Sequence, residues 1–236
     1  MANEKNLNEL LKWSIESSVP GDPSEPESNG PKTSLNAEML AAIMGAPSDA
    51  ELMQASMAAI TSTDPEITLE SKLTAFDNLE QLVESLDNAN LLSKLGLWTP
   101  LLELLGHEED QLRLMAAWCV GTAVQNNAPS QERLVALGGV EKLVSLALGE
   151  RVPMEKRAGD GDETAEEAVA GSETKDVRRK AVYALSSAVR NYQPALDVAA
   201  KELRKKGEEV QEGIDASDMD AVNELIDGLK QKAINA

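Results

Sequence analysis

The side chains with the greatest potential for chemistry are the only histidine, His107, and the only cysteine, Cys119. A cysteine and a histidine together can form a nucleophile and its base, and both ligate zinc, although zinc sites usually take four protein or water ligands. His107 lies between Gly106 and Glu108 in a predicted loop, whereas Cys119 follows Trp118 in a predicted helix. A buried structural thiol is the common state of such a cysteine. We therefore expect no metal, no cofactor and no catalytic function.

Glycine spacing and carboxylates add no catalytic motif. Neither the phosphate-binding loop nor the dinucleotide fingerprint occurs in the sequence. The pair Gly138-Gly139 is expected to form a turn between helices. Because the chain has 41 aspartates and glutamates, a pair of carboxylates at helical spacing identifies no active site. We therefore expect the protein to act by binding another molecule.

The charge of the chain restricts what it binds. A formal net charge of −19 repels nucleic acid and anionic membrane surfaces, and it favours partners with basic patches. A single cysteine allows no intrachain disulfide, which suits a reducing compartment. The N-terminus lacks the pattern of a secretory signal, and no apolar run approaches the roughly 20 residues that span a bilayer. We expect a cytoplasmic monomer that binds neither nucleic acid nor membranes.

The elements that position any binding residues are predicted to be helices. Aromatic residues make up only 3% of the chain, and leucine, alanine, glutamate, lysine and methionine, which favour helices, are frequent. Residues 1–18 are predicted as a short N-terminal helix and residues 19–33, rich in proline and glycine, as a disordered linker. The spacing of Ser48 and Glu51 predicts a capping box. The pair Asp64-Pro65 predicts the start of the next helix.

An internal repeat occupies the domain predicted for residues 34–236. The segment 112–127 resembles 177–192, so that Arg113 aligns with Arg178, and 72–85 is a third, upstream copy of the same pattern. Between these copies, 96–106 resembles 138–149. A helical repeat of about 40–47 residues is typical of armadillo and HEAT proteins, whose units bury their apolar faces by stacking. The sequence therefore predicts an all-α, armadillo-like, right-handed helical solenoid of about three repeats, near the minimum for stability.

Two further segments complete this domain. Residues 149–176 contain nine acidic and four basic side chains and no leucine, so we expect a mobile acidic insertion between repeats. This insertion explains why the second and third copies lie farther apart in the sequence than the first and second. Residues 195–236 are predicted to form a charged C-terminal cap of one or two helices.

Several motifs resemble one protein family closely. KWSI (12–15), FDNLE (76–80), LDNAN (86–90) and AVQNN (123–127) are similar to the fungal members of a nucleotide exchange factor family that serves the cytosolic 70-kDa heat-shock chaperone. The resemblance implies a curved solenoid that grips the chaperone's nucleotide-binding domain, weakens ADP binding and so promotes client release. It also implies that residues 1–33 compete for the client site, with an apolar stretch formed by Leu10, Leu11, Trp13 and Ile15.

The resemblance to armadillo proteins implies which residues grip. There the third helix of each repeat lines the concave face, and side chains four positions apart share one face of a helix. Three such pairs match the array: Asp77 with Gln81, Trp118 with Thr122, and Tyr183 with Ser187. Polar residues near the ends of the same helices complete the expected site, namely Asn88, Asn90, Gln125, Asn126, Arg190 and Asn191.

Two alternatives stay open at this point. One is a peptide-binding adaptor of the armadillo type, although nuclear-import receptors place asparagine four residues after tryptophan, where this chain has Gln81, Thr122 and Ser187. The other is structural: Trp118 and Tyr183 are equally consistent with core positions. Likewise, Asn88, Asn126 and Asn191 also suit helix ends, where asparagine is common.

Overall fold

The computed structural model describes residues 45, 47–153 and 172–235; the predicted segments 1–18 and 19–33, with Leu10, Leu11, Trp13 and Ile15, lie outside these residues. The chain divides into two compact units, residues 1–52 and 53–236. In the first unit, Ser48 and Glu51 form the predicted capping box at the start of α3 (Asp49–Ile60). The Glu51 Oε2 atom accepts the Ser48 amide at 2.8 Å, and the Ser48 hydroxyl accepts the Glu51 amide at 3.3 Å.

The second unit is all-helical in its described part, and its one β-interaction there is an isolated bridge between Glu150 and Ser172. The helices that follow α3 are α4 (Leu69–Val83), α5 (Leu86–Lys94), α6 (Trp98–Glu103), the short 3-10 helix η1 (Leu104–Gly106), α7 (Asp110–Val124), α8 (Ala128–Ala136), α9 (Gly139–Leu148), α10 (Lys175–Val189), α11 (Gln193–Lys205) and α12 (Met219–Ile234). The predicted all-α, armadillo-like solenoid is confirmed.

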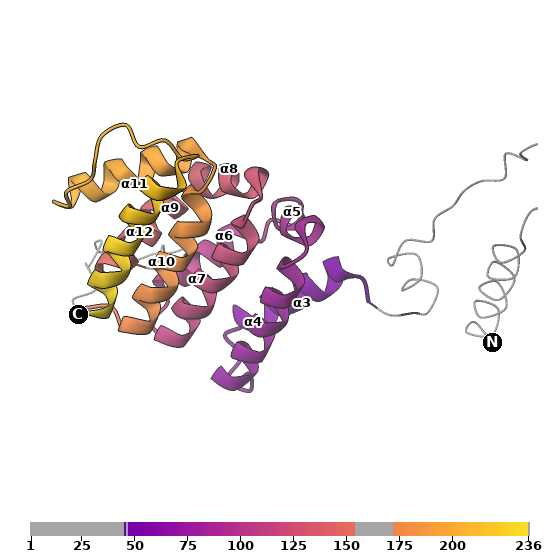
Figure 1. The fold of residues 1–236 in the computed structure, drawn as a ribbon. Helices are drawn as coiled ribbons and strands as arrows, with labels where there is room; N and C mark the ends of the chain where they lie inside the picture. Colours follow the sequence, from indigo (N-terminus) through magenta and orange to yellow (C-terminus); the bar gives the residue numbers. More distant parts are fainter. Residues whose placement is uncertain (1–44, 46, 154–171, 236) are drawn as a thin grey trace, which may run out of the picture. The chain divides into compact units, whose positions relative to one another are not determined.

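Four of these helices form one layer, which we call the third-helix layer: α4, α7, α10 and α12. Helix α7 packs against α4 and α10, and α12 packs against α10, so the four lie side by side (Figure 1). Behind them, α8 contacts α5 and α11, and α9 contacts α10, α11 and α12. The predicted C-terminal cap thus has two helices, of which α12 extends the third-helix layer by one member.

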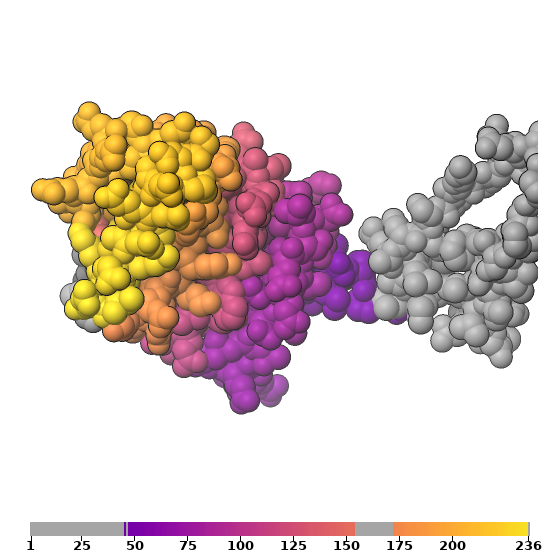
Figure 2. Space-filling model, viewed as in Figure 1, coloured from indigo at the N-terminus to yellow at the C-terminus, as the bar shows by residue number. Residues whose placement is uncertain are grey.

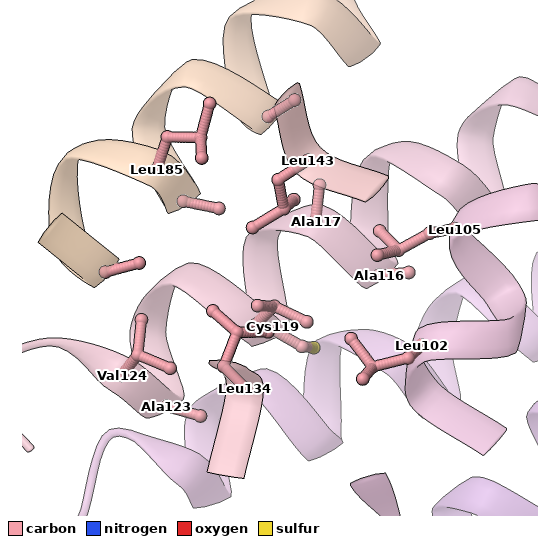
Figure 3. Packing of buried hydrophobic residues seen from close by; sticks show 14 of the residues in the cluster. Leu102, Leu105, Ala116, Ala117, Cys119, Ala123, Val124, Leu134, Leu143 and Leu185 are labelled. Atoms are coloured by element: carbon pink, nitrogen blue, oxygen red, sulfur yellow. The ribbon is translucent and has the colours of Figure 1, made fainter. Parts of the chain in front are cut away.

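Small side chains on α7 allow its close packing. Ala116, Ala117 and Ala123 are buried, and they point into the apolar cluster together with Cys119 (Figure 3). Leucines from neighbouring elements fill the space around them, among them Leu102, Leu105, Leu134, Leu143 and Leu185. Because every buried methylene contributes about 0.8 kcal/mol, this shared cluster is what holds successive repeats together.

A basic residue recurs at the aligned position of each of the three copies and bonds to backbone carbonyls. Lys72 donates to the Ser62 carbonyl at 2.7 Å. Arg113, its equivalent in the second copy, donates to the carbonyls of His107 and Glu108, each at 2.7 Å. Arg178, the equivalent in the third copy, donates to the Lys232 carbonyl at 2.9 Å and to the Ala147 carbonyl at 3.3 Å. The repeated cation therefore provides donors for carbonyl groups at helix ends and in the loops between helices.

The acidic insertion is shorter than residues 149–176. Gly149 ends α9 with a left-handed φ of 93°, and its carbonyl accepts the Glu173 amide at 2.8 Å. The Glu173 carboxylate, fully buried, binds the Nε and Nη2 atoms of Arg113, each at 2.7 Å. Helix α10 already begins at Lys175. Residues 149–153 and 172–176 are thus part of the packed structure, and 154–171 lie outside the described residues. The acidic composition of the segment gave no sign that Glu173 forms an ion pair with Arg113 on α7, in the preceding repeat.

The start of α4 also differs from the prediction. Asp64 and Pro65 lie in a turn, in which the Asp64 carboxylate accepts the Glu66 amide at 2.9 Å. The helix begins only after Thr68, whose hydroxyl oxygen accepts the Ser71 amide at 3.2 Å. A threonine that caps the amide three positions later is the stronger start signal here.

Candidate protein-interaction surface

A groove lies between α4, α5 and α7, and we call it the α4–α7 groove. Its volume is about 500 Å³. The residues that line it are Glu80, Val83, Glu84, Leu86, Ala89, Trp118, Thr122, Gln125, Asn126 and Tyr183. Five of the residues expected from the sequence are therefore brought together at one place. The space-filling view shows α4, α7, α10 and α12 as successive bands of surface, from purple to yellow (Figure 2).

The centre of the layer is a stack of a lysine and two aromatic rings. The Lys180 Nζ atom lies 3.4 Å from the centroid of the Trp118 ring and 5.5 Å from that of Tyr183. Cation–π contacts contribute about 0.5–2 kcal/mol, more when the cation is desolvated. Partial burial lowers the pKa of Lys180, and the nearby Glu80 carboxylate acts in the opposite direction. The lysine thus lies over the Trp118 ring and near that of Tyr183, linking α10 to α7.

Both rings are half-buried, so neither is a simple core residue. Tyr183 packs on α7 at Gly121, where a Cβ atom would come within 2.6 Å of the tyrosine Cε1 atom. Only glycine at this position lets α10 place the ring so close to α7. Half-buried, rigid aromatic side chains are the type that dominates protein interfaces.

Thr122 uses its side chain inside the groove. Its hydroxyl donates to the Glu80 carboxylate at 2.7 Å, linking α7 to α4. Glu80 itself is buried, with 6% of its surface exposed. The position of Thr122 is the one that carries asparagine in import receptors. Here its hydroxyl bonds to a neighbouring repeat and not to an extended peptide.

The other expected site residues lie elsewhere. Asp77 and Gln81 are exposed and bond to each other at 2.9 Å outside the groove. Arg190 is held at the end of α10 by Asn223, at 2.7 Å, and Ser186. Ser187 is 9% exposed and does not line the α4–α7 groove.

Asn88, Asn126 and Asn191 lie near helix ends, as the structural alternative predicts. Asn88 is buried and donates to the Leu82 carbonyl near the end of α4 at 3.0 Å. Asn126 and Asn191 follow α7 and α10 with left-handed φ values of 51° and 55°, a conformation that asparagine tolerates at helix ends. Asn126 also lines the groove. The Asn90 Oδ1 atom is buried without a hydrogen-bond partner among the described residues.

Sequence reasoning missed the α4 and α5 side of the groove and Lys180. The α4–α7 groove is lined by array positions on α7 and α10, but on α4 it is lined by carboxylates that lie outside the array. Glu80 and Glu84 each follow an array position, Asp77 or Gln81, by three residues, and Lys180 precedes Tyr183 by three. That spacing is the signal that could have identified them.

His107 forms a local hydrogen bond, and Cys119 is part of the core. The His107 Nδ1 atom accepts the Glu109 amide at 3.0 Å. Cys119 is buried, and burial raises the pKa of its thiol well above the usual value, with smaller contributions from Glu80 and Asp77. Within the described residues, no group of three or more potential ligands is placed to hold a metal ion. Nor does any helix there have the length and apolarity needed to cross a membrane.

A stack of helical repeats whose equivalent helices form one layer defines the armadillo-like class of helical-repeat proteins. A model of the family described as "Nucleotide exchange factor Fes1" matches residues 7–92. The Hsp70 nucleotide exchange factor FES1 of Gibberella zeae is 54% identical over 230 residues, which are 97% of this chain and 97% of that protein. Its counterpart in Neurospora crassa is 48% identical over 99% of this chain and 100% of that protein. The FES1 of Saccharomyces cerevisiae is 36% identical over 85% of this chain and 60% of the yeast protein. The chain belongs to the Fes1 family of nucleotide exchange factors.

Proposed function

We propose that this protein is a nucleotide exchange factor of a cytosolic 70-kDa heat-shock chaperone. It binds the chaperone's nucleotide-binding domain, accelerates the release of ADP and so promotes client release and folding. The observation that carries this proposal is the 54% identity to a relative named Hsp70 nucleotide exchange factor, over 97% of both chains.

The third-helix layer suits this role because the role needs only differential binding. A partner that binds the open chaperone domain better than the ADP-bound form must weaken ADP binding by the same factor. Each tenfold of weakening requires about 1.4 kcal/mol of difference in binding free energy. The half-buried Trp118 and Tyr183, with the groove beside them, supply such a surface without any catalytic group. We therefore propose that the protein is not an enzyme.

The remaining features of the proposal follow from charge and composition. A net charge of −19 disfavours nucleic acid and anionic membranes as partners, and it favours a soluble monomer. The single cysteine, which allows no intrachain disulfide, suits the reducing cytoplasm. For residues 1–33, with Leu10, Leu11, Trp13 and Ile15, we propose competition for the client site. The adaptor interpretation has no comparable support, because the Thr122 hydroxyl is engaged by Glu80 and the relatives are named as exchange factors.

The experiment is a stopped-flow measurement of fluorescent ADP leaving the purified chaperone. The full chain, mixed with an excess of unlabelled nucleotide, should raise the release rate in a saturable manner. The isolated nucleotide-binding domain should respond as the whole chaperone does. No acceleration at saturating protein would remove the proposed function, and acceleration of the whole chaperone alone would remove the nucleotide-binding domain as its target.

A further inference from the structure

A second groove lies in the third-helix layer next to the first, and we call it the α10–α12 groove. It has a volume of about 520 Å³ and shares Tyr183 with the α4–α7 groove. Its other lining residues are Leu114, Asp176, Arg179, Lys180, Val182, Ser186, Lys230 and Ile234. Because one tyrosine belongs to both, a partner seated on the first groove is in reach of the second.

The two grooves carry opposite charge. The lining of the α4–α7 groove has two carboxylates, Glu80 and Glu84, and no lysine or arginine, although Lys180 lies over the ring of Trp118 at its edge. The α10–α12 groove has three cations, Arg179, Lys180 and Lys230, against one carboxylate, and it has them in a chain of net charge −19. The linings of the two grooves therefore differ in the sign of their charge.

The cations at the rim of the α10–α12 groove have only weak partners. Arg179 lies 3.9 Å from Asp176, with side chains 62% and 75% exposed. Lys230 lies 2.8 Å from Asp227, with side chains 52% and 64% exposed. Exposed pairs of this kind contribute about 0–1 kcal/mol, so exchanging these carboxylates for those of a partner costs little. The charge is thus available for recognition.

Each groove also has an exposed apolar side chain. Three large apolar side chains are exposed among the described residues; Leu86, 57% exposed, lines the first groove, and Ile234, 44% exposed, lines the second. Apolar anchors with a charged rim are typical of protein interfaces. The coincidence of anchor and charge marks both grooves as parts of one docking surface.

We propose that this layer recognises its partner by charge asymmetry. An acidic patch beside an apolar side chain on the chaperone domain docks in the α10–α12 groove, and a basic patch faces the α4–α7 groove. The inference rests on the proposed function, and it fixes the direction in which the partner lies along the layer. Such complementarity affects the association rate and specificity more than the final affinity.

The test reverses charge at each end of the layer in the full chain. The variant Arg179→Glu with Lys230→Glu changes two exposed helical positions, and Lys201→Glu with Lys205→Glu makes the same change of charge on α11, away from the layer. Far-ultraviolet circular dichroism should match the wild type for both. The readouts are the association rate with the chaperone domain at low and high salt and the concentration that gives half-maximal ADP release.

We expect the α10–α12 variant to need at least a tenfold higher concentration, to associate at least tenfold more slowly at low salt, and to approach the wild type in association rate at high salt. The α11 control should stay within twofold of the wild type. Glu84→Lys should also slow association, although it makes the protein less acidic.

Three outcomes overturn the inference. If the α10–α12 variant behaved as the wild type does, the proposed acidic patch on the partner would be wrong. An equal effect of the α11 control would make net charge the cause. Faster association of the Glu84→Lys variant would rule out the proposed basic patch on the partner. In each case, ADP release by the wild type would leave the proposed function standing; absence of release by the wild type would instead remove the proposed function.

Discussion

Removal of the Glu173 carboxylate tests how the second unit is held together. In Glu173→Ala, the Arg113 guanidinium keeps its two carbonyl acceptors but loses two hydrogen bonds of 2.7 Å and its counter-charge, at a site where only 3% of its side chain is exposed. Breaking a buried ion pair by removing one partner costs about 3–5 kcal/mol. Because the two carbonyls remain, we expect the lower end, about 3 kcal/mol.

Urea denaturation followed by far-ultraviolet circular dichroism measures this loss. With a slope of about 2 kcal/mol per molar urea, the midpoint should fall by about 1.5 M. The matched control is Asp176→Ala, which removes a carboxylate from the exposed Arg179 pair in the same region. It should change the free energy of unfolding by at most about 1 kcal/mol.

A double variant separates the ion pair from other effects of the substitution. Arg113→Met with Glu173→Ala removes both charges, so it should destabilise less than the sum of the single changes, with a coupling energy of about 2 kcal/mol. The reasoning is refuted by a Glu173→Ala midpoint equal to that of the Asp176→Ala control, or by additive effects of the two single changes.

Other predictions concern the interface, the N-terminal segment and the two titratable side chains. Trp118→Ala with Tyr183→Ala should abolish chaperone binding in a pull-down while the helical spectrum is retained; a loss of helicity would make both rings core residues. Deletion of 1–33 should keep ADP release and slow client release, and unchanged client release would contradict its proposed role. Burial, chiefly, lowers the pKa of His107, so its NMR titration midpoint should lie below that of an exposed histidine; its contribution to stability should be fully present above the unfolded-state pKa near 6.5 and be lost as pH falls from there through the lower folded-state pKa. The buried Cys119 thiol should react with a disulfide reagent only as fast as the protein unfolds, and rapid reaction in the native state would refute its burial.

The fold could be predicted because the same helical pattern recurs in each of the three copies. The alignment of the three copies places Lys72, Arg113 and Arg178 at equivalent positions, and in the structure all three donate to backbone carbonyls. What the repeat pattern could not provide was the long-range partner of Glu173, because an acidic stretch looks the same whether or not one of its members is buried.

The residues of the groove were predictable only in part, for a geometric reason. Alignment selects equivalent positions, such as Asp77, Trp118 and Tyr183, whereas the groove also takes residues of α4 and α5 that lie outside the aligned array. Trp118 and Tyr183 are aligned positions that line the groove. Asp77 is an aligned position too, but it lies outside the groove and accepts a hydrogen bond from Gln81.

The contact of Gly149 with Glu173 has a consequence for how this chain can change. The chain leaves and re-enters the helical stack at adjacent points, Gly149 and Glu173. The entropic cost of closing the connection between them therefore grows only with the logarithm of its length. We therefore expect the connection to tolerate lengthening or trimming while the register of the repeats is preserved.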